Sequence, residues 1–471
     1  MTQRAPRLAP RIAIVGAGFT GTLLAVQLLR QGRGAVGVDL IERSGRFGPG
    51  LAYTTGNPNH LLNVRAANMS AFPDQPAHFI DWLRHTPLSS AETSDEAAST
   101  FVERRTFGRY VGHCLAEAQA ASPQGALAIL SDQVLGIEAR GPAAVLHLAQ
   151  GGARRAVAAV LALGQLPPVP PVRDPVQLTA LAAYRADPWE NGALSGLHAR
   201  APVLLLGTEL TTVDLVISLL DRGHKGPITA LSRRGLLPNR HAPASPRTRF
   251  LPERLPTSIA MLTHLVRAEA RRATARAEDW RSVIDALRPD TAALWQALPL
   301  VERARFLRHV RPWWEVVRHR MAPAVGDRIA AAAASGQFSV IAGKLLAGEP
   351  DGDGARLTYR RRGQSKLETL VAERIVNCSG PSTDLARSGD PLLRQLRSSG
   401  QIRADALGLG LDVTTDSAVI AADGVIAERL FAAGPLCKGA FWEITAVPDL
   451  RQQCAALAQH LIGRLPVADA A

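Results

Sequence analysis

Three glycines near the start of the chain have the type and spacing that bind a dinucleotide. Gly16, Gly18 and Gly21 directly follow a short β-branched run at residues 11–15. Between a strand and a helix, such glycines permit a tight turn, close approach of backbone to a pyrophosphate, and close packing of helix on strand. The unpaired N–H groups of the following helix attract phosphate. The turn therefore requires a helix immediately after it, which the apolar pattern of residues 22–30 predicts.

An acidic residue completes this first pattern. Glu42 closes a predicted second strand at residues 36–41 and follows Gly21 by 21 residues. A carboxylate about 20 residues beyond the glycines accepts hydrogen bonds from the adenosine ribose. Arg43 and Gly50 are further candidate cofactor-binding residues. A glycine-rich turn without a ligand is the alternative, and the strand–turn–helix context argues against it.

A second, weaker turn lies at Gly207. Residues 203–207 predict a strand, 210–220 a helix and 228–231 the next strand. Glu209 occupies the position where backbone must approach phosphate, and a carboxylate there repels a pyrophosphate unless it turns outward or finds a partner. Arg233 and Arg234 follow the next strand, where guanidinium groups suit an adenosine 2′-phosphate. Two interpretations remain open, an NAD(P)H site and a degenerate unit retained for packing.

Composition excludes several other classes of protein. The 471 residues carry a net charge of +13, but the excess is arginine spread along the chain, so no nucleic-acid partner is expected. The four cysteines lie far apart without a C-x-x-C motif, which excludes a redox dithiol and a zinc ribbon, and no metal site is expected. The sequence shows no signal peptide and no membrane-spanning run, which predicts a cytoplasmic protein without a membrane partner. Oligomeric state cannot be read from these features.

The order of predicted elements indicates an α/β fold with two Rossmann-like dinucleotide-binding domains, the second inserted into the first. Residues 1–166 and 376–471 are predicted as two parts of an FAD-binding domain, and 167–200 as a Pro-rich crossing segment. Residues 201–375 are predicted as an NAD(P)H-binding-like domain with a helical insertion at 250–335. Four tryptophans of this insertion are expected in its core: Trp280, Trp295, Trp313 and Trp314.

One intact and one weaker dinucleotide turn favour a flavin enzyme with FAD that is reduced by NAD(P)H. Six longer motifs resemble those of a known protein family. They lie at residues 48–53, 60–65, 69–73, 187–189, 232–238 and 434–449. On these motifs the chain resembles bacterial FAD/NAD(P)-binding flavoproteins, which include a urate hydroxylase and an aspartate N-hydroxylating flavoprotein. The resemblance implies a flavin monooxygenase with molecular oxygen and a small molecule as its partners. The sequence departs from the pattern at Glu209, where glycine is usual, and at Pro435, where many two-domain flavoproteins carry an aspartate.

The resemblance also implies a substrate site. Its candidate catalytic residues are Asn63, Arg65, Lys438 and Trp442, and Gly434 joins the cofactor-binding set. Other candidate pocket residues are His60, Phe441, Glu443 and Thr445, although a lone histidine such as His60 is more often a core residue. The resemblance leads us to expect hydroxylation of urate to 5-hydroxyisourate in purine degradation. Urate is a planar monoanion, so its site needs a cation, which Arg65 or Lys438 could supply, and aromatic faces, which Trp442 and Phe441 could supply. The alternatives are an amine or amino-acid N-hydroxylase of natural-product synthesis, and a flavin-binding protein without turnover.

Overall fold

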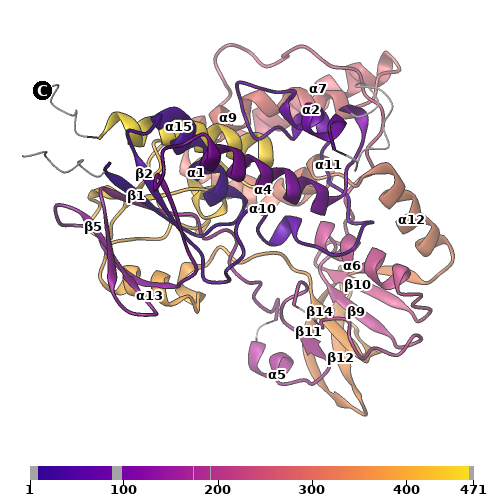
Figure 1. Ribbon diagram of the computed structural model, residues 1–471. Helices are drawn as coiled ribbons and strands as arrows, with labels where there is room; N and C mark the ends of the chain where they lie inside the picture. The colour runs from indigo at the N-terminus through magenta and orange to yellow at the C-terminus, as the bar shows by residue number, and fades with distance from the viewer. Residues whose placement is uncertain (1–8, 87–97, 173, 191, 466–471) are drawn as a thin grey trace, which may run out of the picture. The chain divides into compact units, whose positions relative to one another are not determined.

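The computed structural model describes residues 9–86, 98–172, 174–190 and 192–465 (Figure 1). The chain divides into two compact units: unit 1 is residues 1–56, 64–166 and 383–471, and unit 2 is residues 57–63 and 167–382. Most of unit 2 thus lies in the sequence between two parts of unit 1. The predicted α/β class with a second unit inserted into the first is confirmed.

Unit 1 is built on a six-stranded sheet with the order β15-β16-β7-β1-β2-β3. The five strands from β16 to β3 pair in parallel, and β15 is antiparallel to β16. β1 and β2 are almost entirely buried, because parallel strands are covered on both faces. The strands are β1 Arg11–Val15, β2 Gly37–Ile41, β3 Leu127–Leu130, β7 Ala158–Leu161, β15 Ala418–Ile420 and β16 Ile426–Ala432.

Helix α1 (Phe19–Gly32) directly follows the first glycine turn, with Gly18 at its N-cap, and packs beside α4 (Arg104–Ala120) and α15 (Val447–Gly463) (Figure 1). It begins at Phe19, earlier than the predicted Thr22. Twelve of its 14 residues are buried, so it is a core helix rather than an amphipathic surface helix. A separate antiparallel sheet consists of β4 Val134–Glu138, β5 Ala144–Leu148 and β6 Ala153–Ala156. The remaining helices are α2 His78–Arg84, α13 Pro391–Ser398, α14 Lys438–Phe441, η1 Leu51–Tyr53, η2 Ala66–Asn68, η4 Leu385–Arg387 and η5 Pro435–Cys437.

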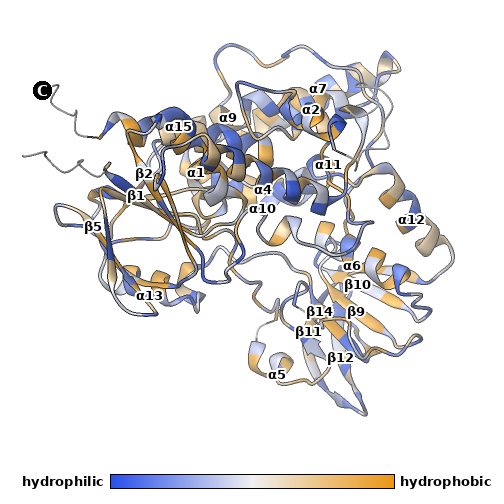
Figure 2. Cartoon of the chain, in the orientation of Figure 1, coloured by the Kyte–Doolittle hydropathy of each residue, from blue (hydrophilic) through white to orange (hydrophobic). Residues whose placement is uncertain are grey.

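Unit 2 contains a seven-stranded sheet with the order β13-β12-β11-β10-β9-β14-β8. β9 (Val203–Leu206) and β10 (Ile228–Ser232) flank α6 (Leu210–Asp221) and are parallel, as the sequence predicts. They are largely hydrophobic in colour in Figure 2, in keeping with their buried positions. The other strands are β8 Tyr184–Arg185, β11 Phe338–Asp351, β12 Gly354–Arg361, β13 Leu367–Ala372 and β14 Arg374–Asn377.

The predicted helical insertion contains helices α7 to α12. Their bounds are α7 Ile259–Ala275, α8 Arg281–Ala286, η3 Arg288–Asp290, α9 Thr291–Ala297, α10 Leu300–His309, α11 Arg311–Arg318 and α12 Pro323–Ala334. Trp295 is a core residue with 3% of its surface exposed, but Trp313 is 49% exposed, so the expectation of a core position is wrong for Trp313. Trp280 and Trp314 are half-buried. In the described residues, no helix has the length and hydropathy to cross a membrane.

The segment predicted to cross between the domains, residues 167–200, belongs to unit 2. It contains a short helix, α5 (Pro175–Thr179), and strand β8. Unit 2 extends to residue 382, beyond the predicted end at 375, and also includes residues 57–63 from the first part of the chain. The side chains of Asn57 and Asn59 both donate to Asp221 on α6, which fixes this short segment on unit 2.

Candidate functional site

The first glycine turn of unit 1 has no room for side chains. Gly16 has a φ of +103°, and a Cβ there would lie 2.4 Å from the carbonyl oxygen of Ala162. A Cβ at Gly21 would lie 1.8 Å from the Gly16 carbonyl oxygen. Both positions therefore require glycine for the turn itself, whether or not a ligand binds.

Gly18 has a different environment from the other two glycines. Its φ is −70°, which any residue can adopt, and a Cβ there would meet nothing closer than Gly50 Cα at 3.5 Å. The Gly48 N–H donates to the Ala17 carbonyl over 2.9 Å, which holds the loop of Gly48 and Gly50 against the turn. Gly18 and Gly50 thus present bare backbone to each other beside the N-terminus of α1. This is a cradle of backbone that a side chain would fill, and it fits the pyrophosphate of a dinucleotide.

Glu42 lies against the same turn. Its carboxylate accepts from the N–H groups of Ala17 and Ser44, each over 2.9 Å. A carboxylate has about four acceptor positions, so Glu42 keeps capacity for ribose hydroxyls. The neighbouring Arg43 is an exposed side chain that forms an ion pair with Asp390 over 3.0 Å. The proposed role of Arg43 at the cofactor therefore competes with this ion pair.

Gly434 adjoins the beginning of α1, because a Cβ at Gly434 would lie 2.9 Å from Thr20 Oγ1. The N–H of Gly434 donates to Gln453 Oε1 over 2.9 Å, and Gln453 Nε2 contacts Ser417 Oγ. Sequence analysis missed Gln453. The sequence feature that could have indicated Gln453 is its position on the apolar face of a helix, between the buried Leu450 and Leu457, because a buried polar side chain needs a hydrogen-bond partner.

Lys438 and Trp442 form one local structure in unit 1. The Lys438 ammonium lies 4.5 Å from the centre of the Trp442 ring, a cation–π contact, and Trp442 is 3% exposed. Trp442 has a φ of +44°, an uncommon backbone conformation for a bulky residue. Of the neighbouring candidates, Glu443 is buried and its carbonyl accepts from the Thr445 N–H, whereas Phe441 is half-buried.

The remaining candidate substrate residues do not share a unit. Arg65 is the half-buried N-cap of η2 in unit 1, whereas Asn63 belongs to unit 2, where its carbonyl oxygen lies 3.0 Å from His241 Nε2. His60 also belongs to unit 2 and is 3% exposed. Its Nε2 contacts Ser218 Oγ over 2.9 Å and the Asp214 carbonyl over 3.0 Å. These contacts support the interpretation of His60 as a structural residue.

The second glycine turn lies between β9 and α6 in unit 2. A Cβ at Gly207 would lie 2.2 Å from the Cys378 carbonyl oxygen, so this glycine is required by packing alone. Glu209 is the exposed N-cap residue of α6. Arg233 is exposed, and Arg234 Nη2 donates to the Arg308 carbonyl over 3.4 Å.

A comparison with known protein families adds to the evidence from the glycine turn. Residues 13–166 match a family model described as FAD-NAD(P)-binding. This match covers the first glycine turn, Glu42 and Gly50. The predicted cofactors, FAD and NAD(P)H, are confirmed. No curated protein matches this sequence.

Several solved structures resemble the fold over 97% of this chain. Ornithine hydroxylase (PvdA) from Pseudomonas aeruginosa has a TM-score of 0.65 and 16% identity and is covered over 100% of its length. An ornithine N-hydroxylase of Kutzneria sp. 744, in a complex named KtzI-FADred-NADP+-L-orn, has a TM-score of 0.61 and 13% identity and is covered over 99%. The FAD-bound cadaverine monooxygenase DfoA from Erwinia amylovora has a TM-score of 0.65 and 11% identity and is covered over 95%. At these identities the likeness establishes the fold.

Proposed function

We propose that this protein is an FAD- and NAD(P)H-dependent monooxygenase that hydroxylates the nitrogen of a small amine or amino acid. The observation that carries the proposal is the backbone cradle of Gly18 and Gly50, within a fold like that of solved amine hydroxylases. In this reaction the amine, O₂, NAD(P)H and a proton give a hydroxylamine, NAD(P)⁺ and water. One oxygen atom forms the new N–O bond and the other leaves in water.

The cysteines support oxygen, rather than a protein thiol, as the electron acceptor. All four are free and buried. Burial raises the pKa of Cys378 and of Cys437 to about 12, and it raises the pKa of Cys114 and Cys454 as well. Since the thiolate is the reactive form, these thiols are unsuited to relay electrons from a flavin.

The residues proposed to bind FAD and the substrate belong to unit 1. Bound FAD supplies the activation of oxygen, and the protein supplies binding and orientation. The Gly18–Gly50 cradle and Glu42 hold the cofactor. Lys438, whose ammonium is positioned by the Trp442 ring, is the candidate partner for the carboxylate of an amino-acid substrate, and Arg65 is a second cation.

The geometry favours the amine over urate. The urate prediction needs a free aromatic face at Trp442, but Lys438 covers one face of this buried ring. The three solved structures above are named for ornithine or cadaverine, and none is named for urate. The amine N-hydroxylase, the second reading from the sequence, therefore becomes the leading proposal.

The test uses FAD-loaded protein with NADPH or NADH and one candidate substrate at a time: ornithine, lysine, cadaverine, aspartate or urate. NAD(P)H oxidation and oxygen uptake are measured together, and the product is identified by its mass. We expect one amine to increase both rates and to gain one oxygen atom. Lys438→Met should raise the KM for an amino acid that has a carboxylate more than the KM for cadaverine, which has none.

Three other results would redirect the proposal. Loss of urate absorbance with coupled NAD(P)H oxidation would restore the urate hydroxylase. If NAD(P)H oxidation yields only hydrogen peroxide with every compound, none of the tested compounds is the substrate. Failure of both nicotinamide cofactors to reduce the flavin anaerobically would favour the flavin-binding protein without turnover.

A further inference from the structure

The helical insertion of unit 2 contains a groove that the proposed reaction does not use. The groove lies between α7 and α10 and has a volume of about 390 Å³. Its lining is Ile259, Ala260, Thr263, His264, Arg267, Arg271, Arg305, His309 and Val310. Five of these nine residues are arginine or histidine and none is acidic, so the lining differs from an ordinary mixed surface.

The cationic side chains of the groove come from one face of α7 and from α10 opposite. Residues 260, 264, 267 and 271 recur at helical spacing and so share one face of α7. Arg267 and Arg271 are exposed, and within the described part of the chain neither has an ion-pair partner. Two like charges four residues apart repel each other. An anion between them removes this repulsion.

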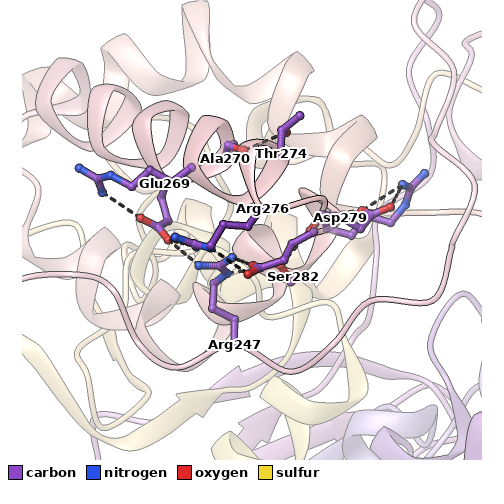
Figure 3. Close-up of polar contacts among 10 residues, drawn as sticks. Arg247, Glu269, Ala270, Thr274, Arg276, Asp279 and Ser282 are labelled. Carbon is purple, nitrogen blue, oxygen red and sulfur yellow. Dashed lines mark hydrogen bonds and ion pairs between the residues drawn. The ribbon is translucent and has the colours of Figure 1, made fainter.

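Two carboxylates of α7 and α10, Glu269 and Glu302, pair with arginines other than Arg267 and Arg271. Glu269 lies two residues from both groove arginines, about 200° around the helix. It pairs with Arg247, Arg272 and Arg276, and Figure 3 shows it beside Arg247 and Arg276. Glu302 of α10 accepts from the Ile259 N–H and pairs with Arg305. Arg305 is therefore partly neutralised, while Arg267 and Arg271 keep their full charge.

We propose that this groove binds a phosphate-bearing anion between Arg267 and Arg271. Guanidinium groups bind phosphate through two parallel hydrogen bonds, and two of them on successive turns of one helix match a phosphate or pyrophosphate. The side chains of Ile259, Ala260 and Val310 give the groove an apolar wall for the rest of an organic phosphate. The volume lies in the range of small-ligand sites, roughly 300–1,000 Å³. This site is independent of the proposed hydroxylation.

Two sources could supply this phosphate, a soluble phosphate compound or the headgroup of a phospholipid. The test measures binding of inorganic pyrophosphate to FAD-loaded protein by calorimetry, and binding of vesicles of equal phosphatidylcholine and phosphatidylglycerol by sedimentation. The variant is Arg267→Gln/Arg271→Gln. The matched control, Arg254→Gln/Arg394→Gln, removes two exposed arginine charges that do not line the groove.

We expect the groove variant to weaken binding at least tenfold, with wild-type melting temperature in the absence of ligand, and the control variant to bind like wild type. Pyrophosphate binding assigns the source to a soluble phosphate compound. Vesicle binding without pyrophosphate binding assigns it to a lipid headgroup. The proposal is overturned if neither probe binds, if the groove variant binds as wild type does, or if both double variants lose binding equally.

Discussion

Substitution of single glycines separates binding of the cofactor from stability of the fold. Gly18→Ala places a methyl group 3.5 Å from Gly50 Cα, an ordinary contact, at a backbone conformation that alanine tolerates. Because alanine restricts the unfolded chain, the free energy of unfolding should stay the same or rise by up to about 1 kcal/mol. The same methyl group, however, covers part of the bare backbone of Gly18 and Gly50 beside the N-terminus of α1, which a pyrophosphate must approach closely.

The loss of FAD affinity follows from the hydrogen bonds that a displaced phosphate forfeits. Each hydrogen bond to a charged group contributes roughly 1.5–3 kcal/mol. Loss of one such bond weakens FAD binding about 10- to 150-fold, since 1.4 kcal/mol corresponds to a factor of about ten. Gly21→Ala should behave differently, because its Cβ would lie 1.8 Å from the Gly16 carbonyl. We expect that variant to be destabilised by about 1–3 kcal/mol or more.

Two measurements on each variant distinguish a role in FAD binding from a role in stability. Denaturant unfolding of the apoprotein gives stability, and quenching of flavin fluorescence during titration gives the dissociation constant for FAD. Gly463→Ala is the matched control, since a Cβ there meets nothing within 4 Å. If Gly18→Ala binds FAD as tightly as the control, the cradle is not the pyrophosphate site. If Gly18→Ala loses stability as Gly21→Ala does, the distinction between the two glycines is wrong.

Three further variants probe unit 2. Changing Arg233 and Arg234 to alanine should weaken NADPH binding by roughly 1–3 kcal/mol per lost charged contact and leave NADH unchanged; equal effects on both cofactors in binding titrations would exclude a 2′-phosphate site. Burial opposes ionisation of Asp221, but hydrogen bonds from Asn57, an arginine and a second asparagine outweigh it and lower the pKa of Asp221. Asp221→Asn should therefore cost about 1 kcal/mol at pH 7, and this difference should begin to shrink below about pH 4, the ordinary pKa of the carboxyl, and be lost as the pH falls through its lowered native pKa, because only the ionised form is stabilised; a gap in unfolding free energy that is constant with pH would contradict this. Glu269→Gln removes the carboxylate that pairs with Arg272, while Arg247 keeps its ion pair with Glu278, so the variant should cost about 1–3 kcal/mol, seen as a lower denaturation midpoint.

Local signals in the sequence were enough to predict the elements around each glycine turn. The strand at residues 11–15 and the helix and strand that follow it lie close to their predicted positions, because the turn and the apolar runs are encoded within about 30 residues. Helix α1 begins at Phe19 rather than Thr22. The reason is that Gly18 itself is the N-cap and that Phe19 and Thr20 are buried.

Contacts between distant parts of the chain could not be predicted in this way. The anchoring of Asn57 and His60 on α6 joins residues more than 150 positions apart, so nothing near residue 60 indicates that this segment belongs to unit 2. The ion pair of Arg43 with Asp390 spans 347 positions and competes with the cofactor-binding role that the sequence predicts for Arg43. The exposure of Trp313 likewise depends on how the helices of the insertion pack, which composition does not determine.

The strand order of unit 1 has a consequence for its assembly during folding. The family match ends at residue 166, yet β7 within it pairs on one side with β16, which the ribosome makes more than 250 residues later. Until then β7 is an open sheet edge, and α1 lacks the helix α15 that covers it. Newly made residues 13–166 therefore expose an aggregation-prone edge while residues 167–382 of unit 2 are synthesised. A fragment that ends at residue 166 should be insoluble for the same reason, and adding residues 383–471 in trans should rescue it.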